Sequence, residues 1–139
     1  MLKEKGSLAA WLRPNARPQV CLMSQVTFYN QSKETLLGDA VDIADTAATR
    51  NRGLLKHDHL NEGEGLWIVP CEAVHTFWMR FAIDAVFLDK HKKVTKVVAN
   101  LRPSRLAMSW RARSVLELPA GRAAQTRTEP GDQIEIRRP

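Results

Sequence analysis

Apolar and polar residues alternate along most of the chain with the two-residue period that is typical of β-strands. The alternation is clear in 36–45, where Val41 and Ile43 alternate with Asp42 and Ala44. Further short apolar runs follow, separated by turn-forming segments such as NEGEG, DKHKK and EPGD. The predicted strands are 20–29, 36–45, 66–69, 74–79, 84–88, 94–99, 114–118 and 133–137.

One segment, DTAATRNRGLL at 45–55, follows a helical pattern instead. Asp45 or Thr46 can accept hydrogen bonds from the first free amides of a helix, and Gly53 is placed to disturb or end it. The segment PAGRAAQ after Leu118 predicts one more helical turn. Six to eight short strands with one substantial helix predict an α+β domain built on a mostly antiparallel, barrel-like sheet.

The size and composition of the chain fit one domain. It has 139 residues, of which 44% are hydrophobic and 26% charged, within the range of an ordinary globular domain. Residues 1–19 contain Pro14 and Pro18 and show no periodicity, which predicts an N-terminal extension before a compact β-rich domain at 20–139. No stretch approaches the roughly 20 apolar residues of a membrane span.

The two cysteines, Cys21 and Cys71, lie fifty positions apart and form no CxxC pair. This spacing argues against a disulfide framework or a structural zinc site, and favours a reduced, cytoplasmic location. His57 and His59 lie two residues apart but lack further ligands at a recognisable metal-binding spacing. We therefore expect neither a metal nor a cofactor.

Charge is distributed unevenly about the total of +6. Residues 1–89 hold nine Lys or Arg against eleven Asp or Glu, whereas residues 90–139 hold twelve against four. The densest basic segment is LRPSRLAMSWRARS, which contains Arg102, Arg105, Trp110, Arg111 and Arg113. Guanidinium groups and an aromatic ring suit an anion or a nucleic acid, and a solvated loop is the alternative.

The stretch HTFWMRFAID at 75–84 combines polar and apolar residues. In a strand its apolar residues lie on both faces, which predicts a central strand in which His75 and Arg80 need polar partners. Asp84, Glu117 and Asp45 are the candidate partners. Glu117 interrupts the apolar run VLEL, so it either lines a pocket or pairs with an arginine, Arg80 or Arg50.

Several motifs along 40–137 occur together in a characteristic order: RGL, HTF, MRF, FLD, LRP, VLELPAG and GD. Together they resemble the bacterial and archaeal family known as domain of unknown function 192. The resemblance implies a compact β-rich domain with one helix, and it implies no established activity, substrate or cofactor. The chain departs from the family pattern at Ala82, where the family has proline, and at Trp78, where a small residue is frequent.

Three functions are compatible with these residues. The favoured one is a small non-catalytic domain that binds a ligand or a protein partner through His75, Trp78, Arg80, Asp84 and Glu117. The second is a hydrolytic enzyme that uses His75 with Asp84 or Glu117 for proton transfer. The third is nucleic-acid binding through the basic segment from Arg102 to Arg113.

Overall fold

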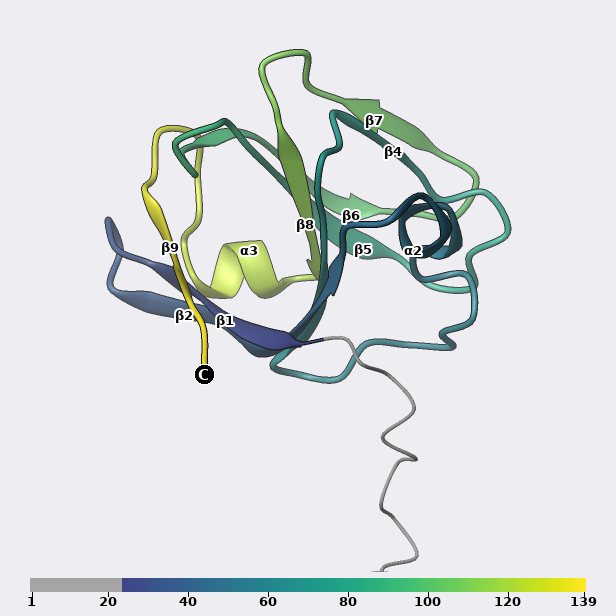
Figure 1. Cartoon of the computed structure of the whole chain (residues 1–139), viewed down its shortest axis with the longest axis horizontal. Helices are drawn as coiled ribbons and strands as arrows, with labels where there is room; N and C mark the ends of the chain where they lie inside the picture. The colour runs from purple at the N-terminus through teal and green to yellow at the C-terminus, as the bar shows by residue number, and fades with distance from the viewer. Residues whose placement is uncertain (1–23) are drawn as a thin grey trace, which may run out of the picture.

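The computed structural model of the protein describes residues 24–139, so the predicted N-terminal extension lies outside the described residues. Seven strands form one sheet in the order β6-β5-β8-β3-β2-β1-β9, and β4 and β7 form a separate pair (Figure 1). The strands are β1 (Gln25–Asn30), β2 (Thr35–Ala44), β3 (Glu64–Ile68), β4 (Ala73–His75), β5 (Ile83–Leu88), β6 (Val94–Leu101), β7 (Leu106–Met108), β8 (Ser114–Pro119) and β9 (Ile134–Arg137). The structure therefore confirms a mostly β-strand, barrel-like domain.

The sheet is mixed, because β2 and β3 run parallel while its other neighbours pair antiparallel. Parallel neighbours need a crossover connection, and residues 45–63 supply it. The sheet also curls so that its two edges approach each other. An isolated bridge pairs Lys93, just before β6, with Gln133, just before β9. These two strands are the opposite edges of the sheet, so the curvature gives a half-barrel.

The prediction of one substantial helix is wrong. α2 (Ala47–Arg52) has six residues and buries none of them, and α3 (Arg122–Gln125) has four. Thr46 and Thr49 form a capping box at the start of α2, and Gly53 ends the helix with φ 48°. Only a residue without a Cβ adopts this backbone readily, so the helical pattern stops one residue before the buried Leu54.

Two apolar clusters lie on opposite faces of β5 and β8, which are buried almost throughout. The barrel core contains Val86, Leu116 and Leu118, together with Val26, Phe28 and other residues of β1–β3. The outer core contains Ala85, Phe87 and Val115, together with Leu54, Val74, Met79 and Ala107. In Figure 1, α3, β9 and β1 lie on one side of β8, and α2 with the β4–β7 pair lies on the other.

The predicted central strand at 74–79 is also wrong. β4 ends at His75, pairs only with β7 and lies outside the seven-stranded sheet. The chain leaves the ladder at the buried Thr76, whose Oγ1 donates to the carbonyl oxygen of Arg102 at 2.6 Å. Trp78 follows with φ 65°, a left-handed conformation that is incompatible with a continuing strand. Arg80, which follows this turn, is therefore not a core residue.

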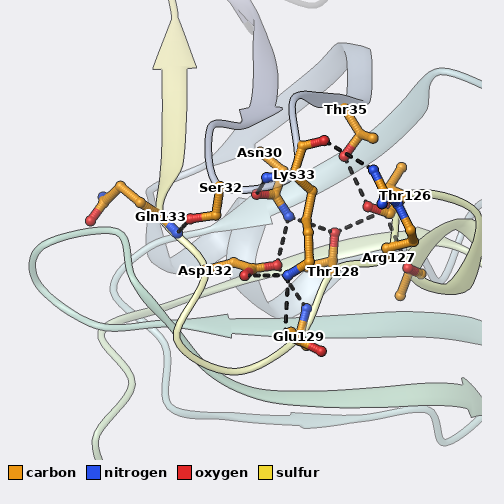
Figure 2. Close-up of polar contacts among 11 residues, drawn as sticks. Asn30, Ser32, Lys33, Thr35, Thr126, Arg127, Thr128, Glu129, Asp132 and Gln133 are labelled. Carbon is orange, nitrogen blue, oxygen red and sulfur yellow. Dashed lines mark hydrogen bonds and ion pairs between the residues drawn. The ribbon is translucent and has the colours of Figure 1, made fainter.

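A buried polar network closes the far end of the barrel, between the β1–β2 turn and residues 126–133 (Figure 2). Asn30 is fully buried and donates from Nδ2 to Thr128 Oγ1 at 3.1 Å and to Asp132 Oδ2 at 2.9 Å. Lys33 Nζ donates to Asp132 Oδ1 at 2.7 Å. Burial alone raises the pKa of Asp132, but hydrogen bonds from Asn30, Lys33 and the backbone of Glu129 outweigh it and lower that pKa. The network ties the β1–β2 turn to the segment that leads into β9.

Replacing Asn30 with alanine is expected to lower the free energy of unfolding by about 2–3 kcal/mol, because the substitution leaves buried partners without hydrogen bonds. Urea unfolding of the variant measures this loss. The matched control is Gln31→Ala, since Gln31 is the exposed neighbour whose side-chain amide donates to Glu135 of the edge strand β9. Equal losses in the two variants would contradict a structural role for the network.

Within residues 24–139, no helix is long and apolar enough to cross a membrane.

Candidate ligand-binding pocket

A pocket of about 480 Å³ lies on the outer-core side of the sheet. It opens between α2 with its following loop, the end of β3, β4 and the middle of β8. Its size falls within the roughly 300–1,000 Å³ that is usual for small-molecule sites. The lining residues are Arg50, Asn51, Arg52, Gly53, Leu54, Leu55, Ile68, Pro70, Cys71, Ala73, Val74, His75, Trp78, Met79 and Glu117.

Glu117 provides the buried acid of this pocket. On β8 it pairs with Ala85 of β5 and Leu66 of β3, and cross-strand neighbours share a face, so its side chain lies on the outer-core side. Only 3% of the residue is exposed. Its Oε2 atom has no hydrogen-bond partner among the described residues. The sequence-based alternative of a pocket-lining residue is therefore the one that the structure supports.

Burial raises the pKa of Glu117 to about 8, because an apolar environment disfavours the ionised form. At pH 7 the side chain is then mostly a neutral carboxylic acid. Such a group can donate one hydrogen bond and accept others. The pocket therefore presents a carboxyl with unused hydrogen-bonding capacity to whatever enters.

Cys71 and Arg50 are further polar groups of the lining. Cys71 is half-buried, and its Sγ donates to the carbonyl oxygen of Ala73 at 3.0 Å. Burial raises the pKa of the Cys71 thiol, so the thiolate that a nucleophile needs is scarce. The guanidinium of Arg50 donates to the carbonyl oxygens of Thr46 and Pro70, at 3.3 and 3.2 Å. These hydrogen bonds fix the position of the charged guanidinium beside the pocket.

His75 and Trp78 line the pocket from its exposed side. The His75 ring stacks on Phe77 with 5.3 Å between ring centroids, and Phe77 contacts Trp78 edge-on at 6.1 Å. Trp78 is 82% exposed. No side-chain hydrogen bond joins His75 to Glu117 anywhere in the described part of the chain. The two residues thus share a pocket without forming an acid–base pair.

Arg80 and Asp84 do not belong to the pocket lining. Arg80 Nη1 pairs with Asp58 Oδ1 at 2.6 Å on the surface, where the two side chains are 75% and 72% exposed. Because β4 ends before Arg80, that residue is free to reach solvent. The expected ion pair between Arg80 and Glu117, or between Arg80 and Asp84, does not form.

Asp84 lies on the opposite face of the sheet from Glu117. It pairs with Leu118, a residue of the barrel core, and is fully buried. Its carboxylate accepts hydrogen bonds from the backbone amides of Asn100, Gly121 and Ala123, at 2.8, 3.0 and 2.8 Å. Asp84 therefore fixes the start of α3 and the end of β6, and it is separated from His75 by the sheet.

The basic segment from Arg102 to Arg113 contributes no residue to the pocket lining. Its four arginines and Trp110 are exposed, and β7 runs through its middle. The sequence had suggested a solvated loop as one alternative, because charge runs more often serve solubility than recognition. The segment forms a surface adjacent to the pocket, because β7 pairs with β4, whose residues line it.

Several lining residues were not predicted as site residues: Asn51, Leu54, Ile68, Cys71 and Met79. They come from α2, from the loop after it, from the end of β3 and from the segments on either side of β4, which meet only in the folded chain. Glu117 was identifiable because it interrupts an apolar strand. No comparable local signal marks the others.

The fold and the pocket define a small half-barrel domain with a buried acid, Glu117, whose Oε2 atom has no hydrogen-bond partner within residues 24–139. The chain belongs to the family of domain of unknown function 192, described as Uncharacterized ACR, whose model matches residues 28–136. Among its relatives is an archaeal UPF0127 protein from Pyrococcus abyssi, which is 34% identical over 113 residues and is covered over 93% of its length and 76% of this chain.

Two solved structures share the fold. A protein of unknown function from Novosphingobium aromaticivorans has a TM-score of 0.69 at 24% identity, covering 79% of this chain and 82% of that one. A Sinorhizobium meliloti protein, whose name proposes a role as a transcription regulator, has a TM-score of 0.70 at 21% identity, covering 81% and 92%. At these identities the likeness concerns the fold alone. The family is uncharacterised, so its name assigns no activity to the pocket.

Proposed function

We propose that this domain binds a small, largely apolar molecule that places an uncharged hydrogen-bonding group, such as a hydroxyl or an amide, against Glu117. The observation that carries the proposal is the buried Oε2 atom of Glu117, which has no partner within residues 24–139. A buried polar atom without a hydrogen bond costs roughly 1–3 kcal/mol. A ligand that completes this bond recovers part of that cost.

The character of the lining supports an apolar body for the ligand. Leu54, Ile68, Val74 and Met79 surround the space, and all four belong to the buried outer core. A few placed polar groups in a mostly apolar lining are typical of sites that fix the orientation of a ligand. The thiol of Cys71 is neutral, whereas Arg50 is charged and has its guanidinium bound to two backbone carbonyl oxygens.

The protonation state of Glu117 favours an uncharged partner over an amine. With a pKa near 8, the carboxyl is mostly neutral at pH 7 and donates a hydrogen bond. Affinity for a neutral acceptor ligand is therefore expected to fall above pH 8, where Glu117 ionises. An ammonium ligand would show the opposite trend over the same range, because it requires the carboxylate.

Native mass spectrometry of the gently purified protein, followed by ligand-observed NMR with neutral and amine-bearing fragments, tests the proposal. Glu117→Gln is expected to lower the affinity for a neutral fragment about tenfold, because the N–H of glutamine donates from a different position than the O–H of the carboxylic acid. Glu117→Leu is expected to weaken it further. The matched control is Glu34→Gln, at an exposed turn remote from the pocket lining. Fragments that bind all three variants as they bind the original chain would contradict the proposal.

The hydrolytic alternative is less favoured. Acid–base catalysis needs a base and a second group within hydrogen-bonding reach of the reacting atoms. His75 and Glu117 line the same pocket but share no hydrogen bond, and Asp84 lies beyond the sheet. A binding role needs only the pocket and the unpartnered acid. A cytoplasmic location also stays a proposal, supported by the free thiol of Cys71.

A further inference from the structure

A second feature lies on the surface beside the pocket. Five large apolar side chains are exposed there: Trp78 at 82%, Trp110 at 81%, Leu106 at 65%, Met108 at 51% and Phe77 at 42%. We call these five residues the apolar patch. In the described part of the chain, only Leu36 and Leu55 are further large hydrophobic residues with this degree of exposure.

The patch is organised by the β4–β7 pair. Leu106 lies opposite His75 and Met108 lies opposite Ala73, whereas Val74 and Ala107 between them are buried. Because side chains alternate across a strand, Leu106 and Met108 share the outward face with His75. The stack from His75 through Phe77 to Trp78 continues this face. Figure 1 shows the β4–β7 pair at the periphery of the molecule, outside the main sheet.

Positive charge lies beside the part of the patch that β7 and Trp110 form. Lys96 Nζ donates to the carbonyl oxygen of Met108 at 3.0 Å, and the Arg111 guanidinium lies 5.9 Å from the centre of the Trp110 ring. Arg105 precedes Leu106 directly. The sequence contains no Asp or Glu from Lys90 to Leu116, a stretch with eight Lys or Arg, and none from Ala73 to Ile83. The carboxylates nearest in sequence are the exposed Glu72, beside β4, and the buried Asp84 and Glu117.

We propose that the apolar patch docks this domain on the surface of an anionic lipid bilayer. Tryptophan is enriched at membrane interfaces, and surface-bound proteins combine inserted aromatic and aliphatic side chains with basic residues. Arginine and lysine near the bilayer gain from the negative potential of anionic lipids. The exposed indoles, the aliphatic side chains and the cations beside β7 supply these elements.

The charge of the patch disfavours a second copy of this chain, because a symmetric contact would bring the same cations together. Single-stranded nucleic acid is the closest competitor. That ligand uses open aromatic faces as stacking platforms, whereas Phe77 already has stacked and edge contacts with its neighbours. Leu106 and Met108 offer no stacking surface, but they suit the apolar edge of a bilayer. Docking would place His75 and Trp78, and with them the exposed side of the pocket, at the lipid headgroups.

Co-sedimentation with vesicles tests the inference. At low salt, the full chain is expected to sediment with vesicles of phosphatidylcholine and phosphatidylglycerol, but not with vesicles of phosphatidylcholine alone. High salt is expected to weaken the binding, since screening reduces the attraction to anionic lipid. Trp78→Ser and Trp110→Ser are each expected to lower the partition coefficient about tenfold, and Arg105→Gln or Arg111→Gln roughly fivefold.

Matched controls separate the patch from general effects. Leu36→Ser removes an exposed leucine from β2, and Arg138→Gln removes an exposed cation near the C-terminus; both variants are expected to bind as the original chain does. Glu117→Gln is also expected to keep vesicle binding, so failure of the ligand proposal and failure of this one are distinguishable. Because the two tryptophans are more than four-fifths exposed, thermal unfolding should confirm that their variants fold.

Absence of sedimentation with anionic vesicles would overturn the inference. Equal losses in the Leu36→Ser variant and the tryptophan variants would overturn it as well. Salt-sensitive binding to a single-stranded oligonucleotide, without binding to anionic vesicles, would assign the patch to nucleic acid instead.

Discussion

Replacing Asp84 with alanine is expected to lower the free energy of unfolding by roughly 3–5 kcal/mol, because three backbone donors lose the fully buried carboxylate that is their common acceptor. The carboxylate accepts hydrogen bonds from Asn100 in β6 and from Gly121 and Ala123 at the start of α3, which are two separate segments of the chain. The substitution therefore loosens β6 and α3 together. Denaturant unfolding, followed by circular dichroism, measures the effect.

Two further variants make this result specific. Asp84→Asn keeps the size and one oxygen acceptor, so an intermediate loss is expected. Asp58→Ala removes a 72% exposed carboxylate whose partner is Arg80, and a change within about 0.5 kcal/mol is expected because surface ion pairs contribute little. An Asp84→Ala protein as stable as the original chain would contradict the structural role and restore Asp84 as a candidate for chemistry.

The second large expected effect is that the free energy of unfolding falls as the pH rises from about 4.5 to 8, because of Glu117. The pKa of Glu117 is about 8 in the folded state and about 4.5 in the unfolded state, so the folded state binds more protons within this window. Stability then decreases as pH rises, and it levels off above pH 8. A shift of this size corresponds to at most about 5 kcal/mol.

Comparison with Glu117→Gln isolates this contribution, because glutamine does not titrate. Relative to the original chain, the Glu117→Gln variant is expected to gain free energy of unfolding as the pH rises from 5 to 8. Glu117→Leu is expected to be more stable than the original chain at pH 8, since an apolar side chain replaces a buried charge. Asp132 does not interfere, because its lowered pKa affects stability only in more acidic solution, below about pH 4. A pH-independent difference would contradict a raised pKa at Glu117.

The sequence predicted the sheet better than the helix. β5 and β8 are nearly continuous apolar runs, and such runs belong to strands buried on both faces. The helix prediction failed because the apolar residues Leu54 and Leu55 extend the pattern past Gly53, whose left-handed backbone had already ended α2. β7 was missed because three residues between arginines carry too little periodicity.

The candidate site was predicted only where one residue departs from its local surroundings. Glu117 departs from the apolar run VLEL, and it does line a pocket. The sequence alone could not show whether Asp84 is a structural or a catalytic acid, because the amides that it binds lie 16 to 39 positions away. Arg80 was expected to be buried, and only the short ladder of β4 reveals that it reaches solvent.

The measurement that most directly tests the central claim is a carbon-13 NMR titration of the Glu117 side-chain carboxyl, assigned by its loss in Glu117→Gln. A neutral acid at pH 7 that titrates near pH 8 is the predicted result, and addition of a bound neutral fragment should raise that pKa further by stabilising the protonated form. An ionised carboxylate at pH 7 with a pKa near 4.5 would contradict it, and would mean that Glu117 is hydrated or paired rather than poised for a ligand.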